Sequence, residues 1–201
     1  MPRRSAVLVS ILFLTALPLA AQTDFGAWLT RVSSSTTHTD GGDIRFDSGT
    51  GYGISIAHRF ATSLSLEAAA YELHRNGHVD LAGVDALNVG RLHMRPITLA
   101  VQWHLAHGAA FDPYVGIGGA YVKTDNLSSD ELEQNGIGSV EVKSGFAPMA
   151  NAGVSFAIGH NLAVGVDVKY VRFHSDSGPD TARVRLELDP VIASAGLRFR
   201  F

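Results

Sequence analysis

The sequence contains no cysteine among its 201 residues, which excludes a disulfide framework, a thiolate metal site and a cysteine nucleophile. Charged side chains make up only 17% of the chain, and no basic run is longer than Arg3-Arg4. Because a nucleic-acid-binding domain normally carries a basic stripe, we expect no nucleic-acid partner. Hydrophobic residues make up 46%, which is too many for a disordered chain. The 21 glycines would interrupt most long helices, so the composition argues against a helical fold.

The first 21 residues have the layout of a secretory signal peptide. Arg3-Arg4 precede an apolar segment that ends in Ala20-Ala21, which matches the positive start, apolar centre and small-residue cleavage site of such peptides. The segment is interrupted by polar residues and a proline, and it is short for a bilayer that needs about 20 apolar residues. We predict a cleaved signal peptide at 1–21 and one domain at 22–201; an uncleaved membrane anchor is the alternative.

Beyond residue 21, large apolar side chains alternate with small or polar ones. In residues 162–170 the branched and aromatic side chains take the even positions, whereas Gly165, Asp167 and Lys169 take odd ones. A period of two predicts strands with two different faces. We predict eight strands, at 24–34, 50–60, 63–74, 93–105, 112–124, 143–158, 161–174 and 184–201.

The connectors between these strands are alternately short and long. The long ones are 35–49, 75–92, 125–142 and 175–183, and they are rich in Gly, Asp, Asn and Ser. Short periplasmic turns alternating with longer extracellular loops are typical of an outer-membrane barrel. The sequence therefore predicts an all-β fold, an eight-stranded antiparallel up-and-down transmembrane β-barrel, in the outer membrane of a Gram-negative bacterium. A soluble barrel, with apolar side chains inward, is the alternative.

On one face of the predicted strands, alternate positions carry polar and charged residues that would point into the lumen. They are Arg59, Glu67, Gln102, Asp167, Lys169, Arg198 and Arg200. Charges in a low-dielectric interior must be paired, so we expect the charged members to form a cluster that closes the periplasmic half to water. A stabilising filler without a transport role is the alternative. Pro96 and Pro148 lie inside strands, where proline cannot donate a ladder hydrogen bond; we expect wall kinks there that allow lateral exit into lipid.

Four segments resemble strands of the OmpW family of small outer-membrane barrels. They are 96–103 (PITLAVQW), 111–118 (FDPYVGIG), 144–154 and 188–199. The resemblance implies a monomeric barrel with a narrow, partly apolar lumen that binds or conducts small hydrophobic molecules. It also implies contact with outer-membrane lipids and lipopolysaccharide, and recognition of the terminal Phe201 by the barrel-assembly machinery. A structural or receptor barrel, whose outer loops bind partners, is the alternative function.

Three further groups of residues carry side chains with possible chemistry. His74, His78 and His93 flank a predicted loop, where unpaired imidazoles are usually solvated, so we predict no metal or other cofactor. Asp130, Glu131 and Glu133 are acidic; we interpret them as solvated, with a calcium or lipopolysaccharide-bridging site as the alternative. Residues 174–177 (HSDS) supply the residue types of a hydrolase, but neighbouring strand residues point to opposite faces. We therefore predict no catalytic residues and no enzyme activity.

Overall fold

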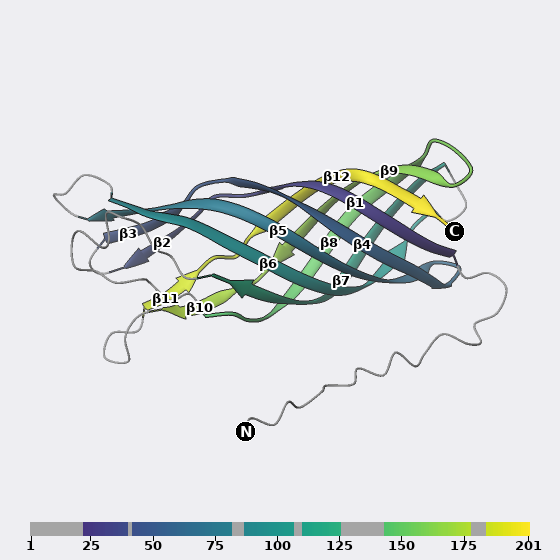
Figure 1. Cartoon of the computed structure of the whole chain (residues 1–201). Helices are drawn as coiled ribbons and strands as arrows, with labels where there is room; N and C mark the ends of the chain where they lie inside the picture. The colour runs from purple at the N-terminus through teal and green to yellow at the C-terminus, as the bar shows by residue number, and fades with distance from the viewer. Residues whose placement is uncertain (1–21, 40–41, 82–86, 107–109, 126–142, 178–183) are drawn as a thin grey trace, which may run out of the picture.

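A computed structural model describes residues 22–39, 42–81, 87–106, 110–125, 143–177 and 184–201. These residues form one long barrel of tilted strands (Figure 1). Among them, no helix is long and apolar enough to cross a membrane. The predicted signal peptide and the acidic residues 130–133 lie outside the described residues, so both interpretations stay predictions.

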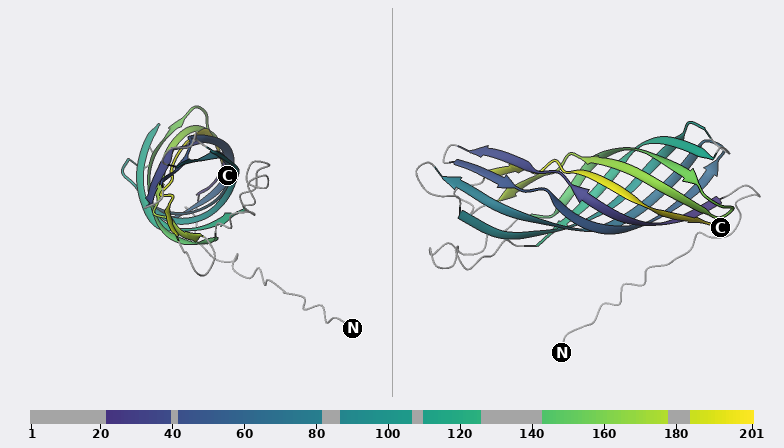
Figure 2. Two further views of the ribbon diagram at one scale, coloured as in Figure 1. Left: turned by 90° about the vertical axis from the view of Figure 1, so that its left-hand side faces the viewer. Right: turned by 90° about the horizontal axis from the view of Figure 1, so that it is seen from above.

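Eight strands close the barrel. They are β1 (Gln22–Val32), β4 (Gly49–Ala61), β5 (Leu64–Leu81), β6 (Leu87–His104), β7 (Phe111–Thr124), β8 (Gly145–Ala157), β9 (Leu162–Val171) and β12 (Val191–Arg200). Each pairs antiparallel with the next, and β1 pairs with β12 to complete the ring (Figure 2, left). This confirms the predicted fold class. The short turns lie at the same end as the start of β1 and the end of β12 (Figure 1), which makes that end periplasmic.

The outer end of the barrel contains more strand than the sequence predicted. Two segments predicted as loops, 35–49 and 75–92, contain β2 (Ser35–Thr39), β3 (Gly42–Phe46) and the outer ends of β5 and β6. The hairpin of β2 and β3 pairs with the outer end of β5. A second small sheet joins β10 (His174–Ser177) to β11 (Val184–Glu187). Strands that project beyond the membrane have no face in contact with lipid, so they do not need an apolar side chain at every second position. A search for such alternation could therefore not reveal them.

The outer surface of the barrel is apolar. Leu29, Ile117 and Phe146 are 75%, 73% and 87% exposed, and such a surface belongs in lipid rather than in water. Aromatic side chains gather near the two ends of the apolar band, as in other outer-membrane barrels. The outer group is Tyr52, Tyr121, Phe146 and Tyr170, and the periplasmic group includes Phe60, Trp103, Phe111, Phe156 and Phe199. The soluble-barrel alternative is therefore wrong.

Glycines make room for one large side chain inside the barrel. Trp28 of β1 is 3% exposed, and its Nε1 donates to Ser55 Oγ at 2.9 Å. A Cβ atom on Gly165 would lie 2.8 Å from Trp28 Cη2, and one on Gly196 would lie 2.9 Å from Trp28 Cε3. The cross-strand pair Gly165–Gly196 therefore leaves the space that the indole fills.

A valine at position 165 should force the indole out of its place. Because overpacking typically costs about 1–3 kcal/mol, we expect Gly165→Val to lower the free energy of unfolding by roughly that amount in urea titrations of barrels folded into lipid vesicles. Ala195→Val adds methyl groups beside Gly196 but faces lipid, so it should leave stability nearly unchanged. Equal stability losses for the two variants would contradict this packing account.

Candidate functional site

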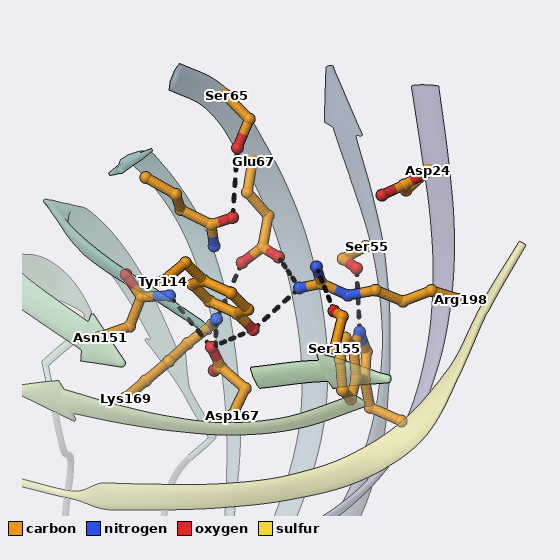
Figure 3. A network of polar contacts seen from close by, with 12 residues as sticks. Asp24, Ser55, Ser65, Glu67, Tyr114, Asn151, Ser155, Asp167, Lys169 and Arg198 are labelled. Carbon is orange, nitrogen blue, oxygen red and sulfur yellow. Dashed lines mark hydrogen bonds and ion pairs between the residues drawn. The ribbon is translucent and has the colours of Figure 1, made fainter. Parts of the chain in front are cut away.

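Four charged side chains meet in the middle of the barrel interior. Lys169 Nζ lies 2.8 Å from Glu67 Oε1 and 2.6 Å from Asp167 Oδ1. Arg198 Nη2 lies 3.2 Å from the other carboxylate oxygen of Glu67. All four side chains are at most 4% exposed. We call these four residues the central charge network (Figure 3).

Neutral polar groups complete the contacts of the central charge network. The Tyr114 hydroxyl donates to Asp167 Oδ2 at 2.9 Å and accepts from Arg198 Nη2 at 2.9 Å. Asn151 Nδ2 also donates to Asp167 Oδ2, at 3.0 Å, and Arg198 Nη1 donates to Ser155 Oγ at 3.2 Å (Figure 3). These contacts join β5, β7, β8, β9 and β12 across the lumen.

The charges of the network balance, with two carboxylates against one ammonium and one guanidinium. A buried ion pair is tolerated when its partners neutralise it and hydrogen bonds satisfy its remaining atoms. Arg198 also lies over two aromatic rings, 5.1 Å from the centroid of Trp28 and 4.9 Å from that of Tyr114, contacts that favour a desolvated guanidinium. The arrangement fills this level of the lumen with side chains.

A second polar group lies nearer the periplasmic end. Arg59 Nη2 donates to Asp112 Oδ2 at 2.8 Å, and His104 Nδ1 lies 2.9 Å from the same oxygen. Arg200 Nε donates to Asp24 Oδ1 at 2.8 Å. The lumen therefore has two successive levels of paired charge before the periplasmic mouth.

Ser65, His104 and Asp112 have the spacing of a hydrolase triad. Ser65 Oγ lies 2.9 Å from His104 Nε2, whose other ring nitrogen lies beside Asp112. A hydrolase nucleophile must also reach its substrate, but Ser65 is only 2% exposed. The neighbouring pocket holds about 60 Å³, room for a few waters, and is lined by Arg59 and Asp112 rather than by Ser65. We interpret the three residues as a structural hydrogen-bond chain.

The residues predicted from parity all face the interior, but they do not form one cluster. Glu67, Asp167, Lys169 and Arg198 form the central charge network, whereas Arg59 and Arg200 belong to the periplasmic level. Gln102 accepts a hydrogen bond from Ser65 at 3.3 Å. The partners that sequence reasoning missed are Asp24, His104, Asp112, Tyr114, Asn151 and Ser155. These residues also lie at the inward-facing alternate positions of their strands. The same pattern that identified Lys169 would therefore have identified them.

The outer half of the lumen is filled by apolar side chains, which we call the outer apolar layer. It includes Val32, Phe46, Leu73, Leu92, Met94, Val122, Met149, Val171, Phe173, Leu188 and Ile192, each at most 4% exposed. Arg75, 1% exposed, lies beside this layer and donates to Phe46 O at 3.3 Å and to Ser35 Oγ at 3.0 Å. The interior thus changes from apolar to charged along the barrel axis.

The ladder between β5 and β6 is interrupted over two pairs, although the register is the same on both sides of the gap. Their register passes from the pair Ala70–Ile97 directly to Leu73–Met94, so Tyr71 and Glu72 have no ladder partner on β6. Pro96 lies opposite this stretch, and proline has no N–H to donate. The ion pair of Arg95 Nε with Glu72 Oε2, at 2.8 Å, joins the two strands there. One of the two prolines predicted to kink the wall therefore marks an interruption.

A pocket opens beside this interruption, and we call it the lateral pocket. It holds about 350 Å³ and is lined mainly by apolar groups of β4, β5 and β6. Its lining residues are Tyr52, Gly53, Ile54, Ala70, Tyr71, Glu72, Arg95 and Ile97. Tyr71 also lies within reach of the central charge network, with Lys169 Nζ 5.9 Å from its ring centroid. Tyr71 therefore separates the lumen from the lateral pocket.

Pro148, the other predicted kink, differs from Pro96. The pairing of β7 with β8 continues through it, with Gly119 opposite Pro148. On the other side, Arg172 N donates to Pro148 O at 3.0 Å. Pro148 faces outward near the outer end of β8, where its missing donor interrupts no pair with β7.

Comparison with known proteins identifies the family. The family model described as OmpW matches residues 20–201. The chain belongs to the OmpW family. An uncharacterised outer-membrane protein of Sinorhizobium fredii is 24% identical over 180 residues, covering 86% of this chain and 75% of that protein. The outer membrane protein AlkL of Ectopseudomonas oleovorans is 29% identical over 121 residues, which cover 56% of this chain and 49% of AlkL.

Solved structures of this family's type have the same fold. OprG of Pseudomonas aeruginosa superposes with a TM-score of 0.80 at 19% identity, over 90% of this chain and 96% of OprG. AlkL in lipid bilayers superposes with a TM-score of 0.69 at 18% identity, over 100% of this chain and 97% of AlkL. The OmpW-family chain described here is thus an outer-membrane β-barrel of a Gram-negative bacterium. None of these names denotes an enzyme.

Removing one charge of the central charge network should destabilise the barrel strongly. Lys169→Met leaves Glu67 and Asp167 facing a single guanidinium, and an uncompensated buried charge costs about 3–5 kcal/mol. The double variant Lys169→Met/Asp167→Asn restores neutrality, so we expect it to recover a large part of that loss. The measurement is the free energy of unfolding in urea, in lipid vesicles. A double variant less stable than Lys169→Met would contradict the account.

Proposed function

We propose that this barrel takes up small hydrophobic molecules from outside the cell and releases them sideways into the outer membrane. The molecules enter the outer apolar layer, are stopped by the central charge network, and leave through the wall between β5 and β6. The observation that carries this proposal is the interrupted β5–β6 ladder beside the lateral pocket.

The change in polarity along the lumen supports a route that does not run straight through. An apolar molecule gains free energy by leaving water for the outer apolar layer. To continue toward the periplasm it would have to displace charged groups that are paired at 2.6 to 3.2 Å. Separating buried charges without water costs several kcal/mol. The sideways step leads from one apolar environment to another, and the ion pair at this exit, Glu72–Arg95, is partly exposed rather than buried.

The outer apolar layer must rearrange to accept a solute, because its side chains fill the space. Met94 and Met149, both at most 4% exposed, lie in it. Methionine has three rotatable bonds and adapts to irregular shapes, so these two side chains can move aside most easily. Met94 also lies on β6 two residues from Pro96, next to the interrupted pairs. Entry of a solute and opening of the wall therefore involve neighbouring residues.

A reversible cross-link across the interruption tests the lateral route. The chain has no cysteine of its own, so Ala70→Cys/Ile97→Cys adds one pair at facing positions of β5 and β6 at the edge of the interruption, with Tyr71 and Pro96 left in place. We expect the oxidised barrel to deliver an apolar fluorescent probe, phenylnaphthylamine, into vesicles with an outer leaflet of lipopolysaccharide at least several-fold more slowly than the reduced barrel. The disulfide bond holds the two strands together and closes the exit.

The pair Ala120→Cys/Ala147→Cys serves as the control, because these residues are buried cross-strand partners on β7 and β8. Oxidation there should leave the delivery rate unchanged. If both cross-linked barrels deliver the probe at the rate of their reduced forms, the lateral route is wrong. That result would favour the structural or receptor function, with the projecting strands β2, β3, β10 and β11 as the binding surface.

A further inference from the structure

Three metal-ligating side chains meet on the outward face of the barrel, directly above the interrupted pairs. His74 of β5 and His93 of β6 are cross-strand partners. Their rings pack edge to face, with centroids 4.6 Å apart. Glu72 precedes His74 by two residues on the same face of β5, and its Oε1 lies 3.9 Å from a ring nitrogen of each histidine. The sequence predicted loop for the segment beyond His74, and the strand pairing is what brings the imidazoles together.

The carboxylate of Glu72 is already oriented toward the two imidazoles. Arg95 Nε holds the other oxygen, Oε2, at 2.8 Å, which leaves Oε1 facing His74 and His93. Arg95 is in turn paired with Asp125 at 3.3 Å. Glu72, Arg95 and Asp125 together carry one net negative charge, so the guanidinium does not make the site positive. Partners of this kind orient metal ligands in known sites.

The ligand set fits a borderline metal ion. Two imidazole nitrogens and one carboxylate oxygen, all within 4.8 Å of one another, match the ligands of three-residue zinc sites. Ca²⁺ and Mg²⁺ prefer oxygen ligands, so two nitrogens argue against them. Zinc–ligand bonds are about 2.0–2.2 Å long. To bind one zinc ion, the two imidazole nitrogens and the carboxylate oxygen must therefore move slightly closer to one another. All three side chains are 23% to 37% exposed, and small rotations can supply this approach.

We propose that Glu72, His74 and His93 form a Zn²⁺ site that clamps β5 to β6. Glu72 lines the lateral pocket and is one of the two residues at the interruption that have no ladder partner on β6. A metal ion bound between Glu72, His74 and His93 ties the strands together at the edge of the interruption. Zn²⁺ therefore closes the lateral exit; this regulatory part rests on the proposed function, whereas the binding site does not.

Calorimetric titration of the folded, tag-free full chain with ZnCl₂ in detergent tests the site. We expect one ion per barrel, and affinity reduced about 10-fold or more by His93→Ala, because loss of a ligand costs at least as much as loss of a residue that orients one. His160→Ala is the matched control, since His160 is exposed in a periplasmic turn and should leave binding unchanged. No saturable Zn²⁺ binding, or binding that His93→Ala and His74→Ala leave intact, overturns the site.

A spectroscopic titration with Cu²⁺ provides a second readout of the ligands. Electron paramagnetic resonance should show coupling to two imidazole nitrogens in the parent barrel and to one in His93→Ala. Heat-modifiable gel mobility shows that each variant is folded. A signal with the same nitrogen coupling in both proteins would place the ion elsewhere and overturn the proposed ligands.

Probe delivery measured with and without saturating Zn²⁺ tests the clamp. We expect Zn²⁺ to slow delivery several-fold in the parent barrel and in His160→Ala, but not in His93→Ala. If Zn²⁺ binds as predicted and delivery does not change, although the disulfide of Ala70→Cys/Ile97→Cys slows it, the clamp is wrong and the lateral route stands. If that disulfide also has no effect, the proposed function fails while the zinc site stands.

Discussion

Neutralisation of Glu67 and Asp167 by Lys169 and Arg198 is the constraint on which the barrel interior depends. Each of these groups would be costly alone in a space without water, so the four must come together when the barrel closes. They come from β5, β9 and β12, and contacts with Tyr114 and Asn151 extend the connection to β7 and β8. The network therefore fixes the opposite walls of the barrel relative to each other and fills the lumen between them.

The position of the network also determines where the rest of the chemistry lies. On its outer side the lumen is mainly apolar, with Arg75 buried beside the outer apolar layer, and on its periplasmic side it carries a second set of ion pairs. Tyr71 lies at the boundary, near Lys169 on one side and in the wall of the lateral pocket on the other. The β5–β6 ladder lacks two pairs at this same level, where Pro96 lies opposite Tyr71 and Glu72 of β5. The change of the lumen from apolar to charged and the gap in the β5–β6 ladder thus lie at the same level along the barrel axis.

Alternation is enough to predict the eight strands and the inward face of Glu67, Asp167, Lys169 and Arg198. It cannot say which inward residues share a level, because the stagger between tilted strands decides whether Arg59 meets Glu67 or Asp112. The projecting strands escape prediction because a hairpin in water, such as 35–46, needs no apolar parity. His74 and His93 lie at the ends of two predicted strands, but alternation does not give the register that makes them partners. The contrast between Pro96 and Pro148 depends on the local pairing of each strand, which the sequence alone does not reveal.

Planar-bilayer conductance of the refolded barrel shows most directly whether paired charges seal the lumen. We expect no large, water-filled ion conductance from folded protein, because the central charge network and the periplasmic ion pairs occupy two successive levels of the lumen. A large, steady conductance, from protein whose folding is confirmed by heat-modifiable mobility, would contradict the seal and with it the need for a sideways exit.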